Sequence, residues 1–595
     1  MGFLEPSPPP FELEEWKAKP HLTRLKPLVQ DWGANGFGSP TFVYFIYVFK
    51  LIFFSVGALF VISLTPGLGT LGNLSEWWTE PIVFQKLAVW LLLWEILGLG
   101  AGSMPLSFRF VPPIGGALYW LRPGTVRLPP WPDKVPFTKG TTRTFVDVAL
   151  YAGVLATAVF LLAASGVDSA AGSAGKLPPA GLAVLFAFLG LLGLRDKVSF
   201  LGARPEIYVT ILAVGLFPVD QWIVAWQFVF LFIWWGAATS KLNHHFPFVV
   251  STMMSNAPLI RSRALKRRLW RDYPEDMRPS RLAATIAHLG TVQELGWPLL
   301  LITVDNDTVR TIAIIGMILF HLNITSMFPL AVPLEWNLFM IFGLLFLFGH
   351  YGDVPLSTLD APLLIAFLAI SCIALPILGG LFPEKISFLP SMRYYAGNWA
   401  TTAWLFRKGS GAEEKLDTQV KKPAQIIVKQ VGEIYDPETA EFLLNKGLSF
   451  RALHSHGRAL NGLLPHAVDD VEDYDVREGE LISNIVNGWN FGDAHFHGRQ
   501  LLEAVQDRCG FRPGDVRVIA LESEPTGWGR GHQRYEVWDP VDGLIERGSV
   551  AVQDMITRQP WLDERYDVPV DVDRGEVGGK EPVPVGGSES PAPSP

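Results

Sequence analysis

The sequence predicts an α-helical polytopic membrane bundle of about ten spans, followed by a soluble α+β or α/β domain. Composition is the first observation: 49% of the 595 residues are hydrophobic and only 18% are charged, whereas soluble domains carry about 25% charged residues. The second observation is that the apolar surplus lies in the first two thirds of the chain. The last third has the mixed polarity of a soluble protein, so the chain divides into at least two parts.

The N-terminal arm, residues 1–39, precedes the first apolar run. Its apolar residues Phe11, Leu13 and Trp16 stand among charged residues. This pattern is typical of a short amphipathic helix at the membrane surface, and equally of a cytoplasmic arm that packs against the bundle. Both alternatives place the arm outside the hydrocarbon.

The predicted bundle covers residues 40–382. A helix needs about 20 mostly apolar residues to cross the hydrocarbon, where an exposed backbone finds no hydrogen-bond partner. Two of the candidate runs, 179–194 and 205–218, are short and could instead be re-entrant. The candidate runs are residues 40–65, 81–103, 144–165, 179–194, 205–218, 219–240, 282–304, 309–330, 334–349 and 361–382.

The distribution of Lys and Arg predicts the orientation of the bundle. The loop at residues 65–80 has neither residue type, whereas the loops at 195–204 and 255–281 have three and eight, respectively. Basic loops stay in the cytoplasm in most membrane proteins. We therefore expect a multi-pass protein of the plasma membrane with both termini in the cytoplasm.

The C-terminal third is predicted to contain three parts. Residues 383–407 are expected to form a juxtamembrane segment, and residues 408–569 a soluble cytoplasmic domain that begins at a Gly-Ser-Gly linker. Residues 570–595 are rich in Pro, Gly, Ser and acidic residues and have no aromatic residue. Such a composition cannot bury enough apolar surface to fold, so this tail is expected to be disordered.

Within the soluble domain, strand-like and helix-like runs are interspersed. Residues 425–431 and 516–521 are rich in β-branched residues, whereas residues 439–445 and 499–508 have helical periodicity. This mixture predicts an α+β or α/β domain.

Ionisable side chains inside the apolar runs are the first functional candidates, because a charge at membrane depth normally faces a partner or a cavity. Lys50 and Glu95 lie in consecutive runs, so the simplest explanation for both is an ion pair between antiparallel helices. His288 and Glu294 lie in one of two other consecutive runs, and His321 and Asn323 lie in the next. We expect these four to share a polar pocket.

Lys241, His244 and His245 form a second group. They stand at positions i, i+3 and i+4, so on a helix they would share one face. One interpretation is a lysine that extends to the membrane surface beside interfacial histidines. The other is a base that burial has desolvated, with imidazoles that relay its proton.

Three segments resemble the vitamin K-dependent γ-carboxylase-like superfamily, also called HTTM proteins. In that superfamily a lysine in the matching context activates a quinol, so the resemblance implies that Lys241 is a base and that a quinone binds in the membrane part. It also matches His321 and Asn323 to a His and an Asn of the superfamily. The C-terminal domain does not resemble the superfamily's lumenal domain, and carboxylation of protein glutamate is therefore not expected. The segments are WWGAATSKLNHHFP (234–247), HLGTVQELGWPLLLI (288–302) and LFHLNITSMFPLAVPLEWNLFMI (319–341).

Taken whole, the chain also resembles an uncharacterised family of actinobacterial multi-pass membrane proteins. No activity carries over from that resemblance.

A repeated histidine motif marks the soluble domain: HSHGRAL begins at His454 and HFHGRQL at His495. On strands, the two histidines of each copy would share a face. Together His454, His456, His495 and His497 could bind Zn²⁺ or another divalent metal. Two alternatives remain: the Gly-Arg that follows each pair could open a helix that binds an anion, or the motif could be structural.

These features favour an enzyme that acts on a lipid-soluble substrate, quinone-like or lipid, in a pocket inside the membrane part. Lys241, His321, Glu294 and Asn323 are its candidate catalytic residues, and the reaction would be carboxylase- or epoxidase-like or another lipid modification. The alternative is a lipid or small-molecule transporter, or a membrane scaffold with a cytoplasmic binding domain. Membrane lipids are the expected partners. Nucleic acid is not, because no basic stripe with interleaved aromatic residues is present.

Overall fold

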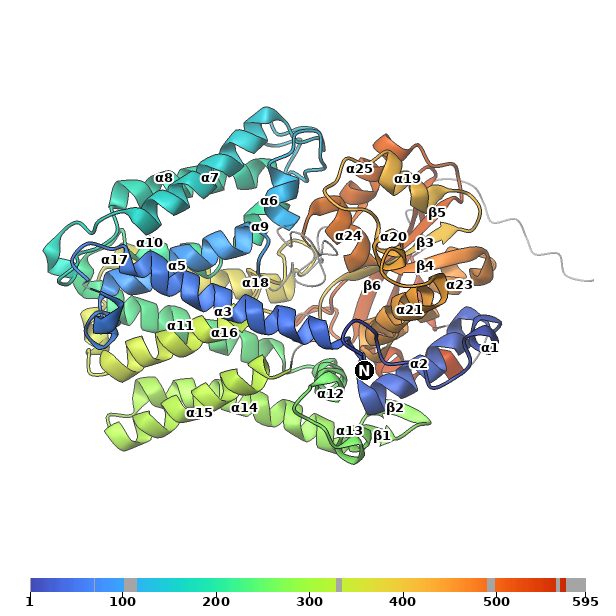
Figure 1. Cartoon of the computed structure of the whole chain (residues 1–595), viewed down its shortest axis with the longest axis horizontal. Helices are drawn as coiled ribbons and strands as arrows, with labels where there is room; N and C mark the ends of the chain where they lie inside the picture. Colours follow the sequence, from blue (N-terminus) through green and yellow to red (C-terminus); the bar gives the residue numbers. More distant parts are fainter. Residues whose placement is uncertain are drawn as a thin grey trace, which may run out of the picture.

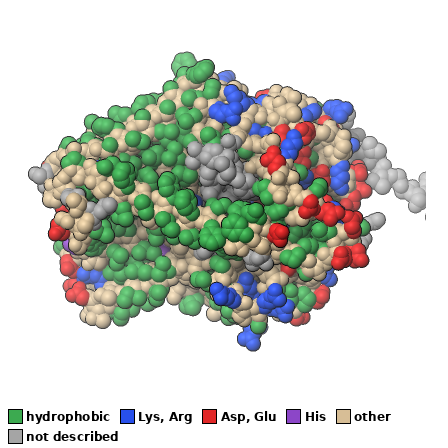
Figure 2. All heavy atoms as spheres, in the orientation of Figure 1, with side chains coloured by type: hydrophobic (Ala, Val, Ile, Leu, Met, Phe, Trp, Pro, Cys, Tyr) green, Lys and Arg blue, Asp and Glu red, His purple; other side chains and the backbone are tan. Residues whose placement is uncertain are grey.

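The computed structural model describes residues 2–68, 70–100, 115–327, 334–489, 498–562 and 568–573. A bundle of long helices occupies one half of the molecule, and a mixed domain covers one end of that bundle (Figure 1). On the face shown in Figure 2, the middle of the bundle is largely hydrophobic, most acidic and basic side chains lie over the domain and the adjoining end of the bundle, and a smaller group lies at the far end. This division matches the predicted change from a membrane part to a soluble part.

Five helical segments of the described chain are long and apolar enough to cross a membrane, so the prediction of about ten spans is not supported. The run at 205–218 contains only α10 (Tyr208–Val214), which is largely buried inside the bundle. Polar residues such as Glu294 lower the hydropathy of α14 (Arg281–Thr303). The five segments are α3 (Thr41–Ser63), α7 (Phe145–Ala163), η3 with α11 (Val219–Ser240), α15 (Asp307–Thr325) and α17 with η6 and α18 (Pro362–Leu381).

Three further apolar helices complete the bundle, and shorter elements join the long ones. The apolar helices are α5 (Pro81–Ile96), α8 (Pro179–Arg195) and α16 with η4 (Leu334–His350). The joining elements are η1 (Leu71–Asn73), α4 (Leu74–Trp77), α6 (Gly115–Trp120), η2 (Ser169–Ala171), α9 (Lys197–Gly202), α12 (Phe246–Asn256), α13 (Arg263–Arg268), β1 (Trp270–Asp272), β2 (Asp276–Pro279) and η5 (Leu356–Thr358). The composite bundle helices consist of η3 (Val219–Gln221) and α11 (Trp222–Ser240), of α16 (Leu334–Leu344) and η4 (Leu345–His350), and of α17 (Pro362–Leu368), η6 (Ala369–Ala374) and α18 (Leu375–Leu381).

The basic loops lie at the end of the bundle that carries the domain. Arg508 donates a hydrogen bond to the carbonyl of Thr141 at 3.0 Å, and Gln500 donates one to the carbonyl of Pro129 at 2.8 Å. Arg278 donates a third to the carbonyl of Thr557 at 3.2 Å. The loops with most Lys and Arg and the C-terminal domain therefore lie on the same side of the spans.

The N-terminal arm packs between the domain and the bundle. It contains α1 (Leu13–Lys17) and α2 (His21–Asn35). The Asp31 carboxylate is 2.5 Å from the ammonium of Lys446, which is fully buried in the domain. Trp32 donates a hydrogen bond to the carbonyl of Thr252 on α12 at 3.1 Å. Of the two predicted alternatives, the structure therefore shows the packed arm.

The C-terminal domain is an α+β domain built on a six-stranded antiparallel sheet in the order β4-β3-β5-β6-β7-β8. The strands are β3 (Thr401–Arg407), β4 (Tyr474–Glu478), β5 (Val516–Leu521), β6 (His532–Asp539), β7 (Gly543–Ala551) and β8 (Val570–Val572). The helices are α19 (Ala412–Thr418), α20 (Ile427–Gly432), α21 (Pro437–Leu453), α22 (Ser455–Gly462), α23 (Leu464–Ala467), η7 (Val471–Asp473), α24 (Gly479–Asn487), α25 (Arg499–Cys509), α26 (Val552–Thr557) and η8 (Pro560–Leu562).

Two boundaries and one secondary-structure element differ from the sequence prediction. The sheet already begins at β3, so residues 401–407 belong to the domain and not to the predicted juxtamembrane segment. The expected strand at 425–431 is instead the loop before α20 and most of that helix. The predicted tail starts too early, because β8 pairs with β7; residues 574–595 lie outside the described residues. The strand at 516–521 and the helices at 439–445 and 499–508 are confirmed.

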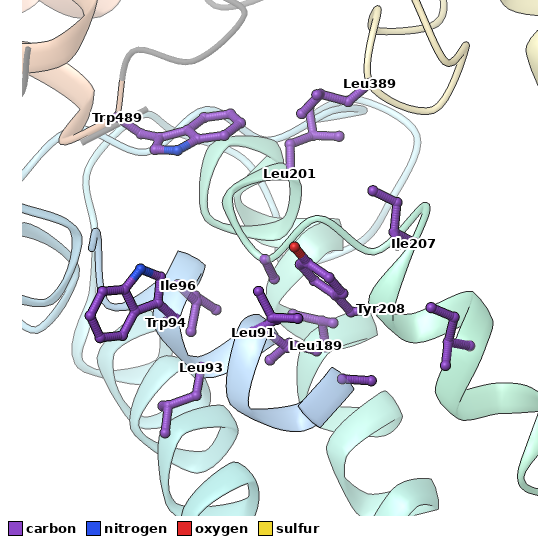
Figure 3. Close-up of a cluster of buried hydrophobic side chains, with 14 of the residues drawn as sticks. Leu91, Leu93, Trp94, Ile96, Leu189, Leu201, Ile207, Tyr208, Leu389 and Trp489 are labelled. Atoms are coloured by element: carbon purple, nitrogen blue, oxygen red, sulfur yellow. The ribbon is translucent and has the colours of Figure 1, made fainter. Parts of the chain in front are cut away.

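The hydrophobic core runs without a break from the bundle into the domain. Side chains alternate across a strand, and in β3 Trp404 and Phe406 join the bundle's core cluster whereas Ala403 and Leu405 join a second cluster with the N-terminal arm. Trp489, just after α24, belongs to the same cluster as Leu201 and Leu389 (Figure 3). The domain is therefore packed against the bundle, not tethered to it.

Candidate functional site

A cavity of about 180 Å³ lies among α11, α12, α14, α15 and α16. Its wall is mostly apolar and aromatic, with a few polar side chains that converge from different helices. All four predicted catalytic residues line this cavity: Lys241, Glu294, His321 and Asn323. The predicted shared pocket is confirmed for Glu294, His321 and Asn323 but not for His288, which is exposed and does not line the cavity. The catalytic roles remain a prediction.

Lys241 and Glu294 form a buried ion pair in the cavity wall. Lys241 caps the C-terminus of α11, where the helix dipole favours a cation. Its Nζ is 2.5 Å from Oε2 of Glu294, and the side chains are only 9% and 6% exposed. The ammonium also lies 5.6 Å from the centre of the Phe246 ring, which adds a cation–π attraction. Each charge therefore depends on the other for its stability in an apolar wall.

His321 is held by hydrogen bonds at both ring nitrogens. The indole of Trp234 donates to Nε2 at 3.0 Å. Because an indole N–H can only donate, Nε2 must accept and the proton of the neutral ring sits on Nδ1. Nδ1 then donates to Oδ1 of Asn337 at 2.8 Å. With both nitrogens engaged, His321 orients the cavity and has no lone pair available to act as a base.

Asn323 and the neighbouring histidines take different places. Asn323 is exposed and lies at the rim of the cavity. Lys241, His244 and His245 do not share a helical face, because α11 ends at Ser240 and α12 begins at Phe246. His244 is exposed, whereas His245 is buried between the bundle and the domain.

His245 connects the two parts of the molecule. Its Nδ1 is 2.7 Å from Oγ of Ser455, and its Nε2 is 3.1 Å from Oε2 of Glu524. Burial raises the pKa of the Glu524 carboxyl, but hydrogen bonds from His245 and from the Gly531 amide lower it. The net result is a pKa below the usual value. An ionised carboxylate only accepts, so Nε2 is the donor and His245 serves as a polar link between α12 and the domain.

Arg204, Trp336 and Tyr394 are among the cavity residues that were not predicted from the sequence. The Arg204 guanidinium stacks 4.6 Å from the ring centre of Trp336 and 5.3 Å from that of Tyr394. Arg204 also pairs with Glu206 through Nε and Oε1 at 2.7 Å. Its φ of +54° is left-handed, a conformation that costs a non-glycine residue energy and is concentrated at functional sites.

The predicted ion pair between Lys50 and Glu95 is wrong. Lys50 instead lies 3.2 Å from Oε1 of Glu335 on α16, and both side chains are almost completely buried. Glu335 was overlooked because it stands at the very start of its apolar run.

The first histidine motif is helical, not extended. His454 is the N-cap of α22, so the strand expected for this motif is wrong. Nδ1 of His454 lies 2.9 Å from the carbonyl of Phe450, and Nε2 of His456 lies 3.1 Å from Nη1 of Arg451. The Arg451 guanidinium therefore contacts Nε2 of His456, a nitrogen that could otherwise bind a metal.

The second motif, with His495 and His497, lies outside the described residues. Among the residues that are described, no group of three or more His, Cys, Asp and Glu could hold a metal ion. The divalent-metal site therefore stays a prediction. The arginines that follow the two motifs have protein partners: Arg458 donates to the carbonyls of Arg558 and Met277, and Arg499 pairs with Glu503.

Comparison with known proteins identifies one family. The family model described as "Transmembrane protein of unknown function (DUF3556)" matches residues 1–573. None of the curated proteins and none of the solved structures compared with the chain matches it. The resemblance to the vitamin K-dependent γ-carboxylase-like superfamily is not confirmed.

Proposed function

The chain belongs to this DUF3556 family of transmembrane proteins, and we propose that it is an enzyme acting on a lipid-soluble molecule, quinone-like or lipid, in the cavity around Lys241. The observation that carries the proposal is the buried pair of Lys241 and Glu294 in a largely apolar cavity. Small-molecule sites typically combine an apolar wall with a few converging polar groups.

Filling the cavity would change the state of the ion pair. A ligand with an apolar body displaces water, and two facing charges lose more from desolvation than a neutral acid and amine do. The proton can then pass from Nζ of Lys241 to Oε2 of Glu294, 2.5 Å away. This transfer leaves a neutral amine that can accept a proton from a hydroxyl group of a lipid or of the reduced, quinol form of a quinone. His321, fixed by Trp234 and Asn337, would orient the substrate beside that amine.

A binding experiment tests the cavity before the reaction is known. Trp234 lines the cavity, so a short-chain benzoquinone that enters it should quench part of the tryptophan fluorescence of the detergent-solubilised protein in a saturable way. Ala287→Phe should abolish the saturable part, because Ala287 lines the cavity and is 1% exposed.

Leu289→Phe is the matched control for that variant. Leu289 lies on the same helix but is 55% exposed on the outer face of the bundle, so this variant should bind like the original. Equal quenching in all three proteins, or none in any, would refute quinone binding in this cavity. Saturable binding without any chemical change in the bound molecule would instead favour the alternative, a transporter for lipids or small molecules.

We also propose that the domain faces the cytoplasm of a plasma membrane. The support is that basic loops and the domain share one end of the bundle, and basic loops favour the cytoplasmic side. A reporter fused after Pro595 should be active only in the cytoplasm, and activity on the opposite side would reverse this orientation.

A further inference from the structure

A second cleft, of about 340 Å³, lies where the bundle meets the domain. Its walls come from the last turn of α11, from α18, and from loops around residues 391–398 and 524–530. The last turn of α11 separates the two hollows, since Ala237 and Lys241 line the first cavity whereas Thr239 and Ser240 line the cleft. The cleft is thus distinct from the proposed catalytic cavity.

Arg393 is the central charge of the cleft. It is only 2% exposed. Its Nε donates to Oγ of Ser391 at 3.1 Å, and its Nη1 donates to the carbonyl of Asn398 at 3.4 Å. Nη2 has no hydrogen-bond partner in the described part of the chain, and no carboxylate there forms an ion pair with this guanidinium. A buried cation without an ion-paired counter-charge is costly, and Arg393 lines the cleft, so an anion that enters the cleft would bring a negative charge to this guanidinium.

The protein's own acids do not occupy this position. Glu524 reaches the cleft, but its Oε1 accepts the amide of Gly531 at 2.7 Å and its Oε2 faces His245. Burial raises the pKa of the Glu522 carboxyl to about 7, so this neighbour carries only part of a negative charge at neutral pH. Burial also lowers the pKa of Arg393 to about 10, against the attraction of the nearby Glu522, which forms no ion pair with it; the guanidinium therefore stays charged at neutral pH.

The cleft combines charged residues with an exposed apolar wall. Its apolar wall includes Ile377, which is 56% exposed, and Leu242, which is 54% exposed. Ile377 lies in α18, the last part of a candidate span, and Leu242 lies two residues beyond the end of α11. Arg530, an exposed residue of the domain, also lines the cleft.

We propose that this cleft binds the phosphate of an anionic glycerophospholipid. The phosphate would accept hydrogen bonds from Arg393 and Arg530, and the acyl chains would lie along the exposed apolar face of α18 beside Ile377. Arginine binds phosphate oxygens through charge-assisted hydrogen bonds. The exposed apolar wall favours a lipid over free inorganic phosphate. The proposal does not depend on the reaction in the first cavity.

The test uses the full chain purified in a mild detergent. The protein is incubated with phosphatidylglycerol, with phosphatidylcholine or with inorganic phosphate, and retained ligand is counted by native mass spectrometry. We expect retention of phosphatidylglycerol alone. Arg393→Gln and Arg530→Gln should each reduce it about tenfold, because a charge-assisted hydrogen bond contributes about 1.5–3 kcal/mol.

Arg534→Gln is the matched control, since this exposed arginine pairs with Glu384 and does not line the cleft; it should retain lipid normally. Arg530 is exposed, so its variant keeps the test valid even if Arg393→Gln fails to fold. Equal retention by the original protein and Arg530→Gln would overturn the proposal. Equal retention of phosphatidylcholine would overturn the need for an anionic lipid, and tight binding of inorganic phosphate alone would overturn the lipid as the source.

Discussion

Removing one partner of the buried ion pair should destabilise the bundle strongly, and removing both should not. Lys241→Met leaves Glu294 without its counter-charge in a wall where both side chains are less than 10% exposed. Breaking a buried pair from one side costs about 3–5 kcal/mol, whereas replacing both partners with apolar residues is often neutral. We therefore expect Lys241→Met and Glu294→Leu each to cost about 3 kcal/mol, and the double variant to recover most of that loss.

The assay is thermal unfolding of the four proteins in one detergent, followed by intrinsic fluorescence. The double variant should recover its stability but lose all activity that depends on Lys241. This combination would separate a role of Lys241 in chemistry from a role in folding. Melting temperatures that fall additively in the double variant would refute the reasoning. Activity in the double variant equal to that of the original protein would refute Lys241 as the base.

Three further outcomes are expected. His454 and His456 are buried, and burial, with the neighbouring Arg451, lowers the pKa of His454 to about 3 and that of His456 well below its usual value. Below pH 6.5 these histidines therefore bind protons in the unfolded chain but not in the folded chain. Lowering the pH from 7.5 to 5.5 should reduce the free energy of unfolding by about 1.4 kcal/mol per histidine. Denaturant unfolding of the full chain measures this change, which should be smaller in a His454→Asn variant. Asn337→Leu removes the hydrogen-bond acceptor of the buried imidazole N–H of His321. It should reduce the free energy of unfolding by about 1–3 kcal/mol and so lower the melting temperature. An unchanged melting temperature would contradict that hydrogen bond. Gly457→Ala would place a Cβ 1.9 Å from the carbonyl oxygen of Arg451, so it should cost about 1–3 kcal/mol from overpacking; a variant as stable as the original would show that the turn before α22 can open.

The location of the site could be predicted because few polar side chains occur in the apolar runs. Lys241, Glu294 and His321 lie in three different helices, yet burial in hydrocarbon forces such groups to meet. Asn337 was not predicted, because an uncharged amide in an apolar run does not indicate a functional site until its hydrogen-bond partner is known. Arg204 was counted as a loop residue that sets the orientation, although it is 1% exposed inside the molecule.

The errors in secondary structure have physical causes. Both faces of β3 are covered, so its residues show no alternation of apolar and polar side chains that would distinguish a strand. The β-branched residues around α20 suggested a strand, but tertiary packing against α21 overrides that weak preference. The span count was too high because an apolar run can also be buried by protein, as in α10, and hydropathy does not distinguish protein from lipid.

The position of β3 has a consequence for how the protein is made. This strand is among the first segments to follow the last apolar helix, yet its neighbours in the sheet are β4 and β5, which the ribosome produces much later. During synthesis, the apolar segment of β3 therefore stays unpaired beside the membrane until the chain has been made past residue 521. A fragment that starts at residue 408 would lack an interior strand and expose the edges of β4 and β5, so the sheet can be completed only by a chain whose membrane part is already in place.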